Sequence, residues 1–546
     1  MPTLNATLDA AKTALFAAQK AIAVTAHNIS NASTEGYTRQ RAVLEASEPL
    51  VYGGLMFGTG VNVASVQRVY DSFTTAQYRD ASSSLSRFEA DEGLLKRLEA
   101  VFNDINGSGA LTYMDKFFNA FQNVANNAPS YTERAQLLST ASSLADTFNN
   151  IASELEKNLS GLNDDIVTVA GQINTLAGQV ADLNLRIAGF ESSGAAANDL
   201  RDKRDIILDK MSEYVSINIV ESDTGAVDVS IAGGSMIVAG VKSSAIKVLK
   251  NNDDPLLYDV VSNGSVINSK ITGGRLKGLV ETAGYYRGAM DRVDRLAAHL
   301  IKEVNMQHKS GYGLDGSTGV DFFSAPTVLA LPSASNTGAT AVSSAVISDY
   351  SLLTFDDYEI RFLDPSSYIV VDSKTKSVVS SGAYSSGSAI TFDGMSVTIE
   401  DTPDPPASGD VYGVSAAKDA AKNFSVALTD ANKIAASGSA AGLPGDNTNA
   451  LLLTELKDKA AVDGATFSEY YRSVISDAAI AASDAGTRYD AQKKITEELK
   501  NLKESASGVS LEEEAVNLIK LQKAFEAAAR VISTVNEMYD ALLNIR

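Results

Sequence analysis

The chain has 546 residues, of which 46 are Lys or Arg and 67 are Asp or Glu, so its formal net charge is −21. This acidic balance argues against nucleic acid and anionic membrane as partners, because both attract Lys and Arg. The chain contains no cysteine, which excludes disulfide bonds, thiolate zinc sites and cysteine nucleophiles. No apolar run reaches the roughly 18 residues of a membrane-spanning helix. The length predicts about three or four domains.

Both ends of the chain predict long helices with a narrow apolar seam. In residues 1–31, apolar or small side chains recur alternately every four and three residues, at Leu4, Leu8, Ala11, Leu15, Ala18, Ile22, Thr25 and Ile29. Residues 511–545 repeat this heptad spacing at Leu518, Leu521, Phe525, Ala528, Ile532, Val535, Tyr539 and Leu542. A long helix with so narrow a seam needs a partner helix to cover it.

The interior combines helical and strand-like segments. Helices are predicted over 67–104, 113–127, 130–192, 198–212, 278–309 and 465–504, and leucines and isoleucines recur at helical spacing throughout 130–192. Residues 214–272 and 320–415 alternate apolar and polar side chains, as strands do. We therefore predict an α+β multidomain fold, in which an elongated helical bundle carries paired N- and C-terminal coiled-coil helices and two inserted β-rich domains.

These composition changes also predict domain boundaries. Residues 1–32 with 510–546 would form a terminal coiled-coil domain. Residues 33–212 with 275–312 and 422–509 would form the helical bundle domain. Residues 213–274 would form a β-rich domain, and residues 313–421 an outer β-rich domain.

Motifs for catalysis or cofactor binding are weak. His27, His299 and His308 lie far apart in the sequence and lack the spacing of metal ligands. Residues 311–316 match GxGxxG, but they follow a predicted helix, whereas dinucleotide sites follow a strand. Phosphate-loop and nucleophile-elbow motifs are missing from the sequence. We therefore expect no catalytic residue, no metal site and no cofactor, and hence no enzyme.

Two terminal motifs carry more information. Residues 23–40 include Asn28-Ile29-Ser30-Asn31 and Thr34-Glu35-Gly36-Tyr37-Thr38-Arg39, which resemble the N-terminal signature of bacterial flagellar rod, hook and hook-associated proteins. Residues 507–519 resemble the start of that family's closing helix. Internal blocks resemble the hook-associated members in particular, at 198–205, 273–279, 304–323 and 445–450. The likeness is weakest over 320–420.

The resemblance implies a structural axial protein that forms the junction between hook and filament and adapts their subunit packing. It implies export by the flagellar type III apparatus to the extracellular flagellum, which suits an N-terminus unlike a secretory signal, since charges interrupt its apolar stretch at Asp9, Lys12 and Lys20. The implied partners are copies of the same chain in a ring or helical assembly, the hook protein, the second hook–filament junction protein and an export chaperone. Nucleic acid and membrane are not among them.

The same resemblance selects residues for the assembly interface. We expect that interface to include Leu8, Leu15, Ile22, Asn28, Asn31, Gly36, Tyr37, Arg39, Leu518, Leu521, Phe525, Ile532 and Leu542. The apolar residues of this set would pack against each other along the seam. Asn28 and Asn31 would cap the end of the first helix, Gly36 would permit a turn, and Arg39 would bridge to a neighbouring acid.

Other readings stay open from the sequence. By periodicity alone, the terminal helices fit a hairpin that closes a monomeric bundle as well as they fit an assembly. One alternative function is an enzymatic or adhesive activity in the inserted region 320–420, carried on a coiled-coil scaffold. Another is a surface adhesin or coiled-coil protein unrelated to flagella.

Overall fold

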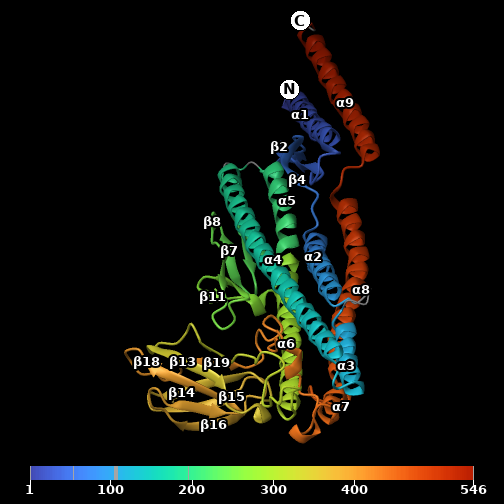
Figure 1. The fold of residues 1–546 in the computed structure, drawn as a ribbon. Coiled ribbons are helices and arrows are strands. Elements are labelled where there is room, and N and C mark those ends of the chain that lie inside the picture. Colours follow the sequence, from blue (N-terminus) through green and yellow to red (C-terminus); the bar gives the residue numbers. More distant parts are fainter. Residues whose placement is uncertain (1, 53, 104–108, 193, 195, 545–546) are drawn as a thin grey trace.

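A bundle of long helices forms the centre of the molecule (Figure 1). The computed structural model describes the chain except for residues 1, 53, 104–108, 193, 195 and 545–546. The bundle contains α2 (Ser72–Val101), α3 (Ala110–Asn126), α4 (Tyr131–Glu191), α5 (Asn198–Tyr214), α6 (Gly274–Lys309) and α8 (Phe467–Ser507). The short helix α7 (Thr448–Glu455) packs against α3 at one end.

The apolar stripe of α4 supplies much of the bundle core. Leu137, Leu144, Leu155 and Ile173 are completely buried, as their helical spacing predicts. Local signals also start the helices, since Thr466 and Glu469 form a capping box at the N-terminus of α8.

The terminal helices α1 (Pro2–Asn31) and α9 (Leu511–Leu543) pair with each other beyond one end of the bundle (Figure 1). They run antiparallel, because Asn28 contacts Glu514 at one end of the pair and Asn5 contacts Tyr539 at the other. Small residues line the contact, and Ala11, Ala18 and Ala528 are buried there. The tip of α9 extends past α1.

A β-hairpin over residues 40–68 departs from the sequence prediction, which placed this segment in the helical bundle domain. The hairpin consists of β1 (Gln40–Ala46), β2 (Leu50–Tyr52), β3 (Leu55–Phe57) and β4 (Val61–Arg68), with β1 paired to β4 and β2 to β3. Its alternation is weak in the sequence because much of both faces stays exposed. The hairpin lies along α1, where the Val61 N–H donates to Thr13 Oγ1 at 3.3 Å.

The first inserted β-rich region packs against α4. Antiparallel strands follow the order β5-β6-β7-β8 in one sheet and β11-β10-β9 in another. Asn184 on α4 donates to the carbonyls of Val227 and Gly240, at 2.8 and 2.7 Å. The strands are β5 (Ile217–Glu221), β6 (Val227–Ile231), β7 (Ser235–Ala239), β8 (Lys242–Ser243), β9 (Lys247–Lys250), β10 (Tyr258–Ser262) and β11 (Ser265–Val266).

The outer β-rich region consists of two sheets with strand orders β12-β19-β14-β15-β16 and β13-β18-β17. Ile360 and Tyr412 of one sheet and Val397 and Ile399 of the other are almost completely buried, which makes a shared core. The strands are β12 (Leu329–Pro332), β13 (Thr340–Ile347), β14 (Tyr358–Asp364), β15 (Ser367–Asp372), β16 (Val378–Ala383), β17 (Ala389–Phe392), β18 (Met395–Asp401) and β19 (Val411–Ser415). The predicted fold class, with its helical bundle, paired ends and inserted β-rich regions, is therefore confirmed.

Candidate assembly site where the terminal helices meet the bundle

A tight turn leads the chain from α1 into the hairpin. α1 ends at Asn31, whose side-chain amide donates to the carbonyl of His27, one turn back in the helix, at 3.0 Å. Gly36 follows with φ +73°, and a Cβ at this position would lie 2.4 Å from Cγ1 of Ile206. Both the backbone conformation and the space therefore require glycine.

Asn28 holds the turn together and does not cap the helix, so the role predicted for it was wrong. It lies inside α1 and is 1% exposed. Its amide nitrogen donates to the Gln40 carbonyl at 2.8 Å and to Glu514 at 3.0 Å. Its oxygen accepts from the Gln40 N–H at 2.9 Å and from the Tyr37 hydroxyl at 2.8 Å. One side chain thus joins α1, β1 and α9.

Tyr37 is suited to this donor role. Burial, reinforced by the nearby carboxylates of Asp199, Asp202 and Glu514, raises the pKa of Tyr37 well above its ordinary value. The phenol therefore keeps its proton and continues to donate to Asn28.

Arg39 forms the second connection. Its guanidinium donates to Glu514 at 2.8 Å and to Glu513 at 3.0 Å, and its backbone N–H donates to the Ser507 carbonyl at 2.9 Å. Glu514 is almost fully buried and accepts from Asn28 as well. Arg39 therefore binds the end of α8 and the first turn of α9 to the strand that follows α1.

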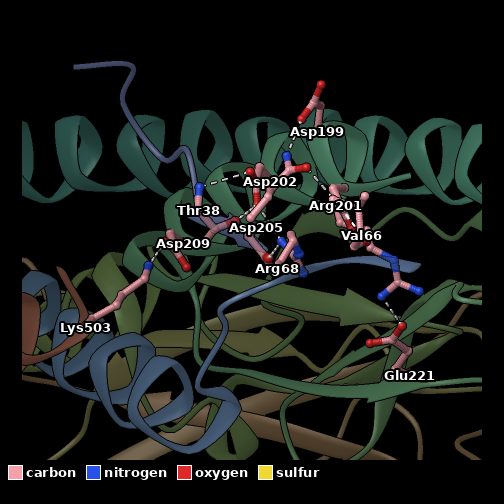
Figure 2. A network of polar contacts seen from close by, with 12 residues as sticks. Thr38, Val66, Arg68, Asp199, Arg201, Asp202, Asp205, Asp209, Glu221 and Lys503 are labelled. Atoms are coloured by element: carbon pink, nitrogen blue, oxygen red, sulfur yellow. Dashed lines mark hydrogen bonds and ion pairs between the residues drawn. The ribbon is translucent and has the colours of Figure 1, made fainter. Parts of the chain in front are cut away.

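An acidic face of α5 completes this connection to the bundle (Figure 2). The Thr38 N–H donates to Asp202 at 3.0 Å. Arg68 at the end of β4 bridges Asp202 and Asp205, with both N–O distances at 2.7 Å. The hairpin is thereby fixed to α5 at both of its ends.

The same face also holds α2 and α8. Arg79 of α2 contacts Asp205 at 3.0 Å and Asp209 at 2.6 Å, and Lys503 of α8 contacts Asp209. Asp202, Asp205 and Asp209 are three and four residues apart, a spacing that places them on one side of the helix. We call Asn28, Arg39, Glu514 and these three aspartates the clasp.

Burial affects the aspartates of the clasp differently. It raises the pKa of Asp202 above its ordinary value, and this outweighs the hydrogen bonds from Thr38 and Arg68. Burial also acts to raise the pKa of Asp205, but Arg79 and Arg68 together hold it below its ordinary value. Asp205 is therefore a stable anion between two cations.

The clasp aspartates were not among the residues predicted for the interface. The sequence placed all three on the predicted helix 198–212, and Asp202 and Asp205 also lie in the segment 198–205 that resembles the family. Carboxylates recurring every three or four residues are a usable signal for a charged helix face. The sequence does not reveal that Arg68, Arg79 and Lys503 meet that face, because those residues are distant along the chain.

The predicted seam residues lie on the paired helices and are only half covered. Intermediate burial is shared by Leu8, Leu15, Ile22, Leu518, Leu521, Phe525 and Ile532. Leu542 lies near the tip of α9 and is 47% exposed. One copy of the chain therefore leaves part of this apolar surface in contact with water.

The histidines on α6 are packing residues. His308 is 1% exposed, and its ring contacts the Val320 carbonyl at 2.8 Å while accepting from the Ala435 N–H at 2.9 Å. Burial lowers the pKa of His308 to about 4, so the ring is neutral at pH 7.

Among the described residues, no group of three or more His, Asp or Glu side chains is placed to hold a metal ion. Within the same residues, none of the helices combines the length and hydropathy needed to cross a membrane.

Family comparisons agree with this architecture. Residues 95–323 match the helical domain of flagellar hook-associated protein FlgK, and residues 331–416 match the D2-like domain of flagellar hook-associated protein 1. The chain belongs to the flagellar hook-associated protein 1 family. Residues 8–38 match the flagella basal body rod protein family, and residues 504–545 match the C-terminal family of the rod proteins FlgEFG. These two segments contain most of α1, all of α9 and the turn between α1 and the hairpin.

Curated relatives extend along the whole chain. Flagellar hook-associated protein 1 of Escherichia coli strain K12 is 29% identical, and the alignment covers 100% of both chains. The protein of that name from Bacillus subtilis strain 168 is 28% identical, over 98% of this chain and 97% of the relative. The flagellar hook junction protein FlgK from Burkholderia pseudomallei has a structure similar to 80% of this chain and 100% of its own, with TM-score 0.67 and 21% identity. That last similarity shows a shared fold.

Proposed function

We propose that the chain is a structural protein of the bacterial flagellar axis, which joins hook to filament and adapts the packing of their subunits. The observation that carries this proposal is the paired terminal helices. They match rod-protein families, lie outside the bundle, and leave their seam half covered. Copies of the chain side by side would bury that seam.

The clasp would transmit force between the axial helices and the outer domains. Its ion pairs connect α9 and the hairpin to α2, α5 and α8, and the hydrogen bonds of Asn28 add α1. A protein that connects the different subunit packings of hook and filament needs such a defined connection between its own domains. The four predicted domains would then move as units around the clasp. These domains are 1–32 with 510–546, 33–212 with 275–312 and 422–509, 213–274, and 313–421.

The proposal includes the partners that the family resemblance implies. These are copies of the chain, the hook protein, the second hook–filament junction protein and an export chaperone. The chain would be exported through the flagellar type III apparatus and act outside the cell. Its role would be structural and not enzymatic. The alternative of activity in the outer β-rich region has lost its basis, since residues 331–416 match a domain of the family itself.

Electron micrographs of cells that lack the gene test the proposal. We expect hooks without attached filaments, and filaments restored when the gene is supplied on a plasmid. Immunogold labelling of the restored cells should mark the hook–filament boundary. Normal motile filaments in the deletion strain would contradict the proposal.

A further inference from the structure

The tip of the β-hairpin exposes apolar side chains. Leu50, Val51 and Met56 are 50%, 66% and 70% exposed. Val51 and Met56 face each other across the paired strands β2 and β3. An isolated two-stranded ribbon is marginally stable in water, so a hairpin tip with apolar side chains gains stability from a surface that covers it.

A second exposed apolar surface lies on α9. Val516 and Ile519 are 51% and 58% exposed, and Lys520 and Lys523 lie on the same face by helical spacing. This α9 stripe, made of those four residues, points away from the seam that meets α1. It therefore remains available when the terminal helices are paired.

The charges of the two surfaces are complementary. Residues 44–57 of the hairpin contain Glu45 and Glu48 but no Lys or Arg. The α9 stripe contains two lysines, of which Lys523 also pairs with Glu526 at 2.9 Å in the same helix. Farther along α9, exposed Met538 is flanked by Glu537 and by Asp540 two residues on, which would repel an acidic tip. The charges therefore favour contact of the acidic hairpin tip with the α9 stripe and disfavour its contact with the C-terminal end of α9.

Within one copy, the hairpin tip and the α9 stripe lie apart. Val61, next to the tip strands, contacts Thr13 in the N-terminal half of α1. The start of the stripe lies opposite the other end of α1, where Asn28 meets Glu514. At 1.5 Å per helical residue, the two surfaces are separated by about 15 Å along the axis. A contact between them thus requires two copies.

We propose that the hairpin tip of one copy docks on the α9 stripe of the next copy, displaced along the helix axis. This inference rests on the proposed self-assembly of the chain. Because the two surfaces differ, each copy offers one of each, and the contact repeats around a ring or along a helix. The apolar side chains supply burial, and the Glu–Lys pairs set the register.

Cross-linking of engineered cysteines tests the contact, since the natural chain has none. Two differently tagged variants, Met56→Cys and Ile519→Cys, are co-expressed in cells without the natural gene. Purified hook–filament structures are then treated with a short bis-maleimide. We expect mixed dimers that carry both tags. A matched control replaces Ile519→Cys by Met538→Cys, on an equally exposed part of the same helix.

The outcomes separate this inference from the proposed function. The docking would be overturned if flagella contained both variants but gave no mixed dimers. It would also be overturned if Met56→Cys gave as many mixed dimers with Met538→Cys as with Ile519→Cys. Either result would leave the proposed junction role intact. Absence of the natural chain from the hook–filament boundary would instead contradict the proposed function.

Charge reversal gives a readout that does not depend on cysteines. We expect Glu45→Lys with Glu48→Lys to lower incorporation of the chain into flagella by about tenfold. Adding Lys520→Glu and Lys523→Glu should restore it. Unchanged incorporation of the doubly reversed hairpin, in a chain that melts normally, would exclude the proposed contact.

Discussion

Asn28 connects α1, β1 and α9 through one buried amide. Asn28→Asp keeps the size of the side chain but loses the donors to Gln40 and Glu514, and it places a second carboxylate 3.0 Å from that of Glu514. We expect the clasp to lose about 2–3 kcal/mol. Amide exchange of the Gln40 N–H measures the loss, and filament attachment in cells reports its effect. Asn31→Asp, at the exposed end of α1, serves as the control. Equal effects of the two substitutions would contradict the central role of Asn28.

Asp294 on α6 gives the bundle a pH dependence. It is 6% exposed and accepts from the backbone N–H groups of Asp419 and Ala421, at 3.1 and 2.9 Å. Burial raises its pKa to about 7. Since the folded chain holds this proton more tightly than the unfolded chain, the group favours folding below pH about 4, and that advantage is lost as the pH rises to about 7.

Asp294→Asn should therefore remove part of the pH dependence of stability. Between pH 4 and 8, we expect the free energy of unfolding of the natural chain to change by up to about 4 kcal/mol more than that of the variant. Urea unfolding at several pH values measures the difference. Asp182→Asn, which alters an exposed carboxylate, should leave the pH profile unchanged. Parallel profiles for the natural chain and Asp294→Asn would show that this group does not titrate as inferred.

At the scale of elements, α5 holds the hairpin, α2 and α8 through its acidic face. Asp205→Ala would leave Arg68 and Arg79 without their shared carboxylate, and both cations are largely buried. We expect a loss of about 3–5 kcal/mol, because each arginine loses one charge-assisted hydrogen bond, worth about 1.5–3 kcal/mol, and keeps only Asp202 or Asp209 as its partner. Chemical unfolding measures it, together with faster amide exchange in β1 and β4. Lys210→Ala, an exposed change on the same helix, should be nearly silent. A similarly small effect of Asp205→Ala would show that water solvates the two arginines.

The helix α9 packs mainly on α1 and little on the bundle. We propose that it acts in assembly. Phe525 is half-buried in the seam, and the main packing of α9 is against α1. If neighbouring copies complete its burial, Phe525→Ala should weaken the α1–α9 pair and its assembly together by about 3–5 kcal/mol. The melting temperature of the bundle in the monomer should barely change. Filament attachment and thermal unfolding measure the two effects, with the exposed substitution Glu526→Ala as control. A large drop in the monomer's melting temperature would favour the closed-hairpin interpretation of the terminal helices.

The terminal pair extends from the bundle and is anchored by the clasp. Ordering a residue costs about 1–2 kcal/mol of conformational entropy, which a half-covered seam offsets poorly. In a dilute monomer we therefore expect amide protection to fade along α1 and α9 with distance from Asn28 and Glu514. Limited proteolysis should leave a resistant middle near residues 50–500. Strong protection out to residues 5 and 542 in a verified monomer would contradict this expectation.

The sequence alone determined the terminal seam helices, the long bundle helices and the β-rich regions. Each of these follows from a periodic pattern within one segment, as in the heptad from Leu4 to Ile29 or the stripe of α4. The flagellar signature at 23–40 is likewise local, and it was enough to place the chain in its broad family.

Only the tertiary structure showed the hairpin over 40–68 and the clasp. The strands β2 and β3 have only three residues each, and the weak alternation of β1 and β4 follows from faces that remain partly exposed. The clasp joins Asn28 to Glu514 and Arg68 to Asp205. The two residues of each pair are more than a hundred positions apart in the chain. Local periodicity reports which face of a segment is buried. It carries no information about which distant side chain will meet that face, because that choice depends on the packing of the complete chain.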